Sequence, residues 1–164
     1  MKHFLLALSL FTTSLAMAQS FVLQDTGRLL SIDRLGNLYD LTQNVAPDKV
    51  KIRGKNWLVT KEGMVTISAD GLVQQRPGFQ LPKIKEHGAS WMIGDKSQLV
   101  IVANDGTVYT VTAPVLDKAK LVTRGGNFFT IRNKDKSLSI ITMDLTNGNF
   151  FVGPSAVMMQ QTPG

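Results

Sequence analysis

Apolar residues along this chain gather in short runs, and residues that favour turns separate one run from the next. Four of the runs occupy equivalent places, at residues 29–32, 64–67, 99–102 and 138–141, and most of their apolar members are Leu, Ile or Val. No window of about a dozen residues shows the 3.6-residue period of an amphipathic helix. The pattern therefore predicts an all-β chain with almost no helix.

An aromatic residue marks the period with which these runs recur. Phe21, Trp57, Trp91 and Phe128 open four similar segments and stand 36, 34 and 37 residues apart. A period in this range indicates a chain that stacks one small unit several times, because a single unit cannot bury its apolar face alone. We predict that these aromatics pack between neighbouring units; stacking on sugars is the alternative.

Turns and a further strand complete each unit. Sequences such as Asp70-Gly71 follow the second run and supply the positive φ that tight hairpins need. Beyond the third strand, lysine alternates with apolar residues at 49–52, 83–85 and 118–121. We expect this fourth strand to close the first three units, and residues 155–160 resemble it without the lysines.

Four hairpin-linked antiparallel strands at a period near 36 residues are the plan of a β-propeller blade. The order aromatic strand, Gly turn, apolar strand, Asp-Gly turn and then Leu38-Tyr39 or Val108-Tyr109 resembles β-propeller repeats of the WD40-like and quinoprotein-like type. The resemblance implies four short four-stranded blades. One chain closing its own ring and two chains sharing a ring of eight blades both stay open, and a β-sandwich or open barrel is the alternative fold.

The first 18 residues stand outside the repeat. Lys2 precedes an apolar stretch over residues 4–15, and Ala16-Met17-Ala18 has the small-x-small pattern of a signal-peptide cleavage site. The stretch is shorter than the roughly 20 apolar residues that span a bilayer. We therefore expect residues 1–18 to be removed on export. Residues 19–164 then form one domain in the periplasm or outside the cell, without a transmembrane segment.

The residue inventory argues against several chemistries. The chain has no Cys, and His87 is the one histidine beyond the expected signal peptide, so catalytic triads and transition-metal sites lack their parts. No glycine-rich loop leads from a strand into a helix to cradle a phosphate. We predict no catalytic residue, no cofactor and no metal, and we interpret His87 as a turn residue. A hydrolase that uses channel carboxylates is the least favoured function.

One aspartate per unit occupies a matching turn, and the four are candidate ligand-binding residues: Asp33, Asp70, Asp105 and Asp144. In a ring these side chains converge at one end, where they suit a hard cation such as Ca²⁺. The favoured interpretation is that each carboxylate bonds backbone N–H groups of its own turn.

Lysines of the fourth strands are candidate residues for binding a polyanion: Lys49, Lys51, Lys83, Lys85, Lys118 and Lys120. A belt of them suits lipopolysaccharide, anionic lipid, teichoic acid or nucleic acid, and the formal net charge of +6 permits such contacts without indicating one. The favoured interpretation is that they protect an exposed edge strand from aggregation. Aromatic residues do not interleave with them, so we expect no specific nucleic-acid partner.

Together these features favour an exported, non-catalytic binding or scaffolding module of the envelope or extracellular space. A protein or glycan is the expected partner, and a lectin-like glycan-binding module is the alternative function. A homodimer corresponds to the shared-ring alternative.

Overall fold

The computed structural model describes residues 20–79 and 83–154 of the 164-residue chain. The prediction of an all-β chain with almost no helix is confirmed. Besides the strands, the described residues contain two short 3-10 helices, η1 (Pro47–Lys49) and η2 (Pro114–Leu116). Neither these nor any other helix in the described ranges is long and apolar enough to cross a membrane.

Fifteen strands form four antiparallel sheets in chain order. The first sheet holds β1 (Ser20–Leu23), β2 (Leu29–Ile32) and β3 (Leu38–Asp40). The second holds β4 (Ile52–Arg53), β5 (Trp57–Val59), β6 (Gly63–Ile67) and β7 (Val73–Pro77). The third holds β8 (Ile84–His87), β9 (Trp91–Gly94), β10 (Gln98–Val102) and β11 (Val108–Thr112). The fourth holds β12 (Lys120–Arg124), β13 (Phe128–Arg132), β14 (Leu138–Met143) and β15 (Phe150–Pro154).

The predicted fourth strand begins a sheet rather than ending one. β4, β8 and β12 pair with the aromatic strand that follows them, so they belong to the next sheet and do not close the preceding unit. A glycine hairpin explains this pairing, because the Gly88 N–H donates to the Trp91 carbonyl at 2.9 Å. The first sheet accordingly starts at its aromatic strand and has three strands among the described residues. The prediction for residues 155–160 lies outside the described residues.

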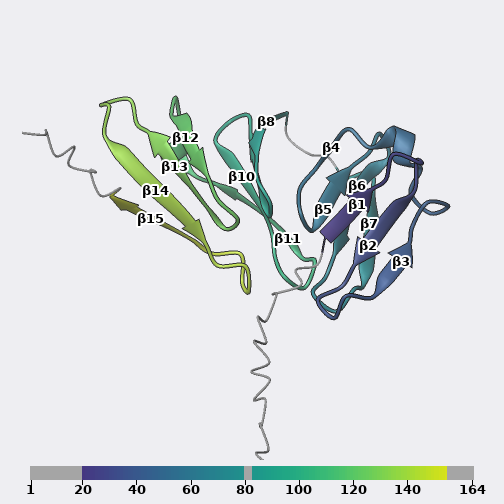
Figure 1. The fold of residues 1–164 in the computed structure, drawn as a ribbon. Coiled ribbons are helices and arrows are strands. Elements are labelled where there is room, and N and C mark those ends of the chain that lie inside the picture. Colours follow the sequence, from purple (N-terminus) through teal and green to yellow (C-terminus); the bar gives the residue numbers. More distant parts are fainter. Residues whose placement is uncertain (1–19, 80–82, 155–164) are drawn as a thin grey trace, which may run out of the picture.

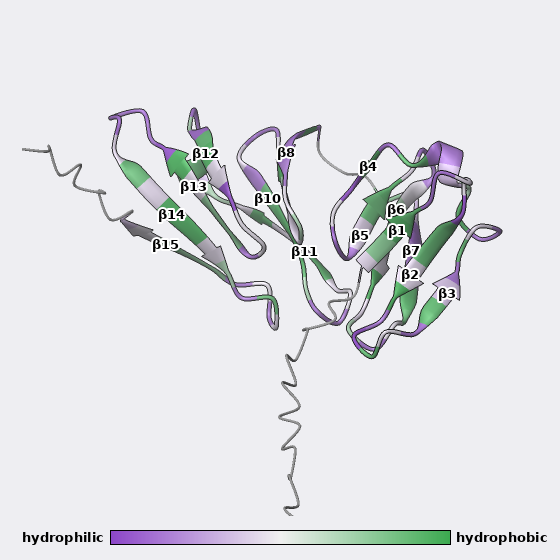
Figure 2. Ribbon diagram, viewed as in Figure 1, coloured by the Kyte–Doolittle hydropathy of each residue, from purple (hydrophilic) through white to green (hydrophobic). Residues whose placement is uncertain are grey.

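The four sheets stand face to face in chain order and form an open row (Figure 1). The sheet β1–β3 lies at one end of the row and the sheet β12–β15 at the other. Figure 2 shows that apolar residues are concentrated in the strands and hydrophilic residues in the turns. Each inner sheet therefore uses both faces for packing, whereas each end sheet has one face turned away from the row.

The core consists of three apolar layers, one between each pair of neighbouring sheets. The layer between the first and second sheets includes Phe21, Leu29, Leu58, Val65 and Ile67. The layer between the second and third includes Trp57, Met64, Met92, Val100 and Val102. The layer between the third and fourth includes Trp91, Ile101, Phe129, Ile141 and Met143.

Three of the four repeating aromatics pack between sheets as predicted. Trp57 and Trp91 are completely buried and Phe21 is nearly so, but Phe128 is 38% exposed. The difference follows from position, because Phe128 faces the side of the last sheet that no described sheet covers. Its neighbour Phe129 points the other way, into the core, with its ring centroid 4.5 Å from that of Trp91.

Main-chain hydrogen bonds also join one sheet to the next at the Asp turns. The Arg34 N–H donates to the Ala69 carbonyl at 3.3 Å, and the Ala69 N–H donates to Asn104 at 2.6 Å. The Asn104 N–H then donates to Leu145 in the fourth sheet at 2.8 Å. We call these three bonds the turn ladder. It holds the turns of all four sheets together along one edge of the row, at the ends of β2, β6, β10 and β14.

Candidate functional site

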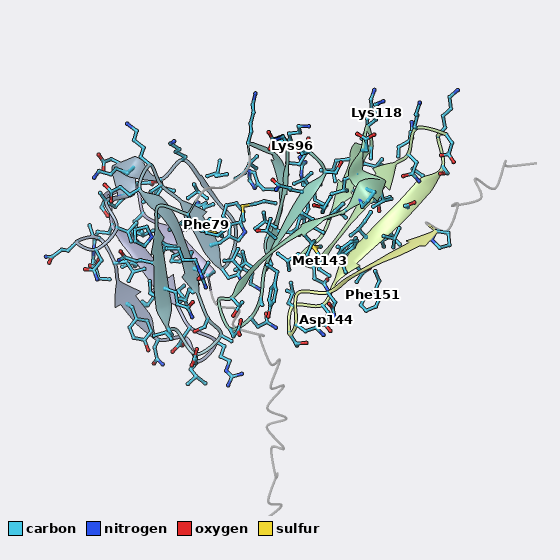
Figure 3. All side chains as sticks on the ribbon, turned by 180° about the vertical axis from the view of Figure 1, so that it is seen from behind. Phe79, Lys96, Lys118, Met143, Asp144 and Phe151 are labelled. Carbon is cyan, nitrogen blue, oxygen red and sulfur yellow. The ribbon has the colours of Figure 1, made fainter. Side chains whose placement is uncertain are left out.

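The two kinds of candidate site residue lie at opposite ends of the sheets. Figure 3 shows Lys96 and Lys118 at one end and Asp144 at the other. The aspartates belong to the turns after β2, β6, β10 and β14, which the turn ladder joins. The lysines belong to the opposite end, where β4, β8 and β12 begin.

Each aspartate accepts hydrogen bonds from its own turn. Asp33 Oδ1 accepts from the N–H groups of Leu35 and Asn37, both at 2.9 Å. Asp105 and Asp144 likewise accept from the N–H two residues ahead, each at 2.9 Å. Asp70 accepts from the Ser68 hydroxyl. This geometry agrees with the favoured turn-stabilising interpretation, most directly for Asp33, Asp105 and Asp144, whose carboxylates accept from backbone N–H groups.

These hydrogen bonds keep the turn carboxylates ionised. For Asp33, burial by itself raises the pKa, but bonds from Asn37, Leu35 and Tyr39 outweigh it, so the pKa lies below the ordinary value. For Asp105, the backbone and side-chain bonds from Thr107 lower the pKa. Stabilising the charged form in this way is the expected effect of bonds to a carboxylate.

A shallow hollow of about 310 Å³ brings two of the four aspartates together. It is lined by Arg34, Ala69, Asp70, Asn104 and Asp105. The guanidinium of Arg34 already supplies a cation there. Across residues 20–79 and 83–154, no three His, Cys, Asp or Glu side chains are grouped so that they could hold a metal ion.

The predicted lysine rows are only partly on strands. Lys85 lies in β8 and Lys120 begins β12, but Lys51, Lys83 and Lys118 precede their strands. Lys49 ends η1, and its Nζ lies 2.5 Å from Glu62 Oε1. Both partners of that ion pair are largely exposed, so it contributes little to stability. The six lysines therefore do not form one continuous belt along equivalent strands.

Three of them meet in a groove between the third and fourth sheets. The groove has a volume of about 380 Å³, and its rim carries the lysines Lys85, Lys96, Lys118 and Lys120. Its floor is apolar, because Ile93, Leu116 and Ile131 are buried there. We call this site the lysine groove.

Two carboxylates also line the lysine groove. Glu86 is already paired with Arg124 across the third and fourth sheets. Asp117 is exposed beside Lys118. The rim carries four ammonium groups, whereas its negative charge comes from Asp117 and from Glu86, which Arg124 neutralises. The rim is therefore positively charged overall.

Unusual backbone conformations concentrate at the same groove. Among the described residues, four that are not glycine have a left-handed φ, and three of these line the groove: Lys96 at 54°, Ser97 at 59° and Lys118 at 57°. Such conformations cost energy in residues with a Cβ and often occur at functional sites. Sequence reasoning did not assign Lys96 and Ser97 to a site, because their turn meets residues 116–121 only through the packing of the third and fourth sheets. These turns thus differ from the Asp-Gly turns at the other end of the sheets, where glycine adopts the left-handed φ.

His87 has a packing position. It ends β8 and is half-buried, with its ring centroid 5.6 Å from that of Trp57 in an edge-on arrangement. The contact spans the second and third sheets. The role of His87 in this position is therefore to pack against an aromatic ring.

Comparisons with protein families, with curated proteins and with solved structures found no match.

Proposed function

We propose that this protein is an exported, non-catalytic binding module of propeller-like architecture, which holds an anionic amphiphile in the lysine groove. The observation that carries the proposal is the combination of four lysines at the rim with an apolar part of the lining, in which Ala119 and Leu121 are partly exposed. A volume of about 380 Å³ lies within the usual range of ligand pockets. The module acts in the periplasm or outside the cell, where its partner is a component of the envelope.

The two chemical surfaces of the groove define the ligand. The ammonium groups of Lys85, Lys118 and Lys120 attract a phosphate, carboxylate or sulfate head. The partly exposed side chains of Ala119 and Leu121, which also line the groove, offer an apolar surface to an acyl or other apolar tail. A simple polyanion uses only the rim, whereas an anionic lipid uses both surfaces. We therefore favour an anionic lipid as the ligand.

The lining of the groove suits binding rather than reaction. Ser97 supplies a hydroxyl, but none of the lining residues is a histidine or cysteine that could activate it. Its two carboxylates, Glu86 and Asp117, stand beside cations or in solvent. This supports a module that holds its ligand without transforming it.

Vesicle binding tests the proposal. We expect the purified protein to sediment with vesicles of phosphatidylcholine that contain phosphatidylglycerol, and not with phosphatidylcholine alone. Each lysine near an anionic membrane contributes about 1 kcal/mol. The triple variant Lys85→Gln, Lys118→Gln and Lys120→Gln should therefore bind roughly a hundredfold more weakly. No binding of the wild type to the anionic vesicles would contradict the proposal.

The matched control uses the other three predicted lysines. Lys49→Gln, Lys51→Gln and Lys83→Gln remove the same charge outside the groove lining. We expect this variant to keep most of its affinity. Equal losses from both triples would show that overall charge, and not the groove, causes binding. Equally tight binding to soluble dextran sulfate would argue against a role for the apolar floor.

A further inference from the structure

The outer face of the fourth sheet carries apolar side chains that no described sheet covers. Phe128 of β13 and Phe151 of β15 flank Thr142 of β14 in one cross-strand register. Phe128 is 38% exposed and Phe151 is 64% exposed. Figure 3 labels Phe151 on β15 at this end of the row. A face of this kind usually marks an interaction surface.

Phe128 and Thr142 on that face correspond to buried positions in earlier sheets. Phe128 occupies the place of Trp57 and Trp91 at the start of the aromatic strand. Thr142 occupies the place of Thr66, because each pairs with the aromatic residue of its sheet. Thr66 is completely buried, and its Oγ1 donates to the Gly106 carbonyl of the following sheet at 2.8 Å. A threonine here is thus compatible with burial against another sheet.

The third strands show the same correspondence. Tyr39 lies against Gly71 of the next sheet, where an added Cβ would come within 3.2 Å of its ring. Tyr109 lies against Gly148, where an added Cβ would come within 2.3 Å. Phe151 holds the equivalent place in the fourth sheet. The glycine of the first sheet's Asp turn is Gly36, which has the same left-handed φ as the others, 86°.

The turn ladder ends with a donor at one side and an acceptor at the other. Leu145, the last residue of the ladder, accepts from Asn104, and its own N–H has no main-chain partner in the part of the chain that the structure describes. Arg34, the first residue, donates to Ala69, and its carbonyl likewise has no main-chain partner there. A further bond from Leu145 to Arg34 of another chain therefore continues the ladder.

The first sheet supplies the opposite half of the interface. Val22, Leu30 and Ile32 stand at the places that Met92, Val100 and Val102 occupy in the third sheet, on the face turned toward the preceding sheet. Leu38 lies on the same face as Ile32 and is largely exposed. Both halves of one repeated interface are thus present, but they lie at opposite ends of the row (Figure 1).

We propose that a second copy of the chain packs its first sheet on the outer face of the fourth sheet, so that two chains close one ring of eight sheets. Two such contacts form, because each copy offers one first sheet and one outer face of a fourth sheet. Identical head-to-tail contacts give a closed ring when the rotation from each copy to the next adds up to a full turn. The occupant is a second copy because the interface continues the packing already seen three times within the chain. The inference concerns assembly and is independent of the ligand in the lysine groove.

Mass in solution tests this assembly. We expect light scattering of the purified protein to give the mass of two chains, without growth to larger species as concentration rises. Phe151→Glu should give the mass of one chain while its circular dichroism spectrum stays that of the wild type. Leu72→Glu, at an exposed leucine in the turn between β6 and β7, is the matched control and should keep the mass of two chains. A wild-type monomer, an open-ended polymer or a dimeric Phe151→Glu would each overturn the proposal.

Cross-linking tests the contact itself, because the chain contains no native cysteine. With Phe151→Cys and Leu35→Cys in one chain, a short bis-maleimide should join two chains, since Leu35 precedes Gly36. Tyr109→Cys with Asn147→Cys copies this geometry inside one chain and should be cross-linked within that chain, without forming dimers. Lys134→Cys with Leu35→Cys places the first thiol in the β13–β14 turn, and its thiols should not be cross-linked to each other. A product of the first pair within one chain would overturn the shared ring, as would the absence of any product.

Discussion

At the scale of single residues, one repeating position has two different environments. Trp57, Trp91 and Phe128 open equivalent strands, yet the two tryptophans are buried between sheets and Phe128 is partly exposed. The spacing of aromatics could predict that these residues pack against a neighbouring unit. It could not show which copy stands at the end of the row, because that depends on which face finds a partner.

Because of these environments, replacing each aromatic residue by alanine should lower the free energy of unfolding by different amounts. Trp91→Ala removes a buried indole whose Nε1 also donates to the Gly125 carbonyl, so we expect a loss of about 3–5 kcal/mol in the free energy of unfolding. Phe128→Ala in the monomeric Phe151→Glu background should cost clearly less. Urea titrations of both variants measure the difference, and equal losses would mean that Phe128 is as well packed as Trp91.

The turn aspartates predict a dependence of stability on pH. Their folded pKa values lie below the ordinary 3.8, as for Asp33 and Asp144. A lowered folded pKa gives stability that is full above the unfolded value and is lost as pH falls through the folded value. We therefore expect the melting temperature to fall below about pH 4 and to be little changed by these groups between about pH 5 and pH 7.

The variant Asp33→Asn isolates one turn. The amide oxygen still accepts from backbone N–H groups but does not titrate in this range. The melting temperature of this variant should therefore decrease less steeply with falling pH than that of the wild type. Parallel acid profiles would show that Asp33 does not contribute to the pH dependence.

At the scale of elements, periodicity predicted the strands well and their partners less well. Short runs of β-branched residues and Asp-Gly turns are local signals, and both appear in the structure where they were expected. The strand at Lys83–Lys85 was assigned to the wrong neighbour, because a strand between two units has the same spacing from both. The hairpin at Gly88 decides the pairing through a hydrogen bond that the pattern of apolar residues does not encode.

Gly88 offers a sharp test of this hairpin. A Cβ at this position would lie 2.3 Å from the Trp91 ring, whereas a Cβ on Gly126 would meet no atom within 4 Å. We expect Gly88→Ala to lower the free energy of unfolding by about 1–3 kcal/mol through overpacking. Gly126→Ala is the matched control and should change stability little. Chemical denaturation compares the two, and similar effects would contradict the close packing of Gly88 on Trp91.

At the scale of the whole molecule, the lysine groove and the open row both arise from how sheets meet. The sequence indicated lysines near residues 85 and 118, but Lys96 joins them only because the third and fourth sheets bring two loops together. No local pattern marks that meeting, since residues far apart along the chain create it. The sequence pattern did not predict the floor residues Leu116 and Ile131 for the same reason.

A shared ring makes stability depend on concentration. If the folded state is a pair of chains, dilution favours dissociation and lowers the melting temperature. We expect calorimetric scans of the wild type to shift downward with each dilution. Phe151→Glu should melt at one temperature throughout, and a wild-type melt that ignores concentration would contradict the dimer.

The turn ladder has a consequence for how such a chain grows. Its bonds run between main-chain atoms, and the side chains at its four positions are as different as those of Arg34, Ala69, Asn104 and Leu145. The ladder therefore sets the spacing of sheets without restricting which residue stands there. A duplicated unit inserted between two sheets would find its main-chain partners already in place. Duplication followed by free divergence at these turns is thus a route open to this architecture, and one open to protein engineers.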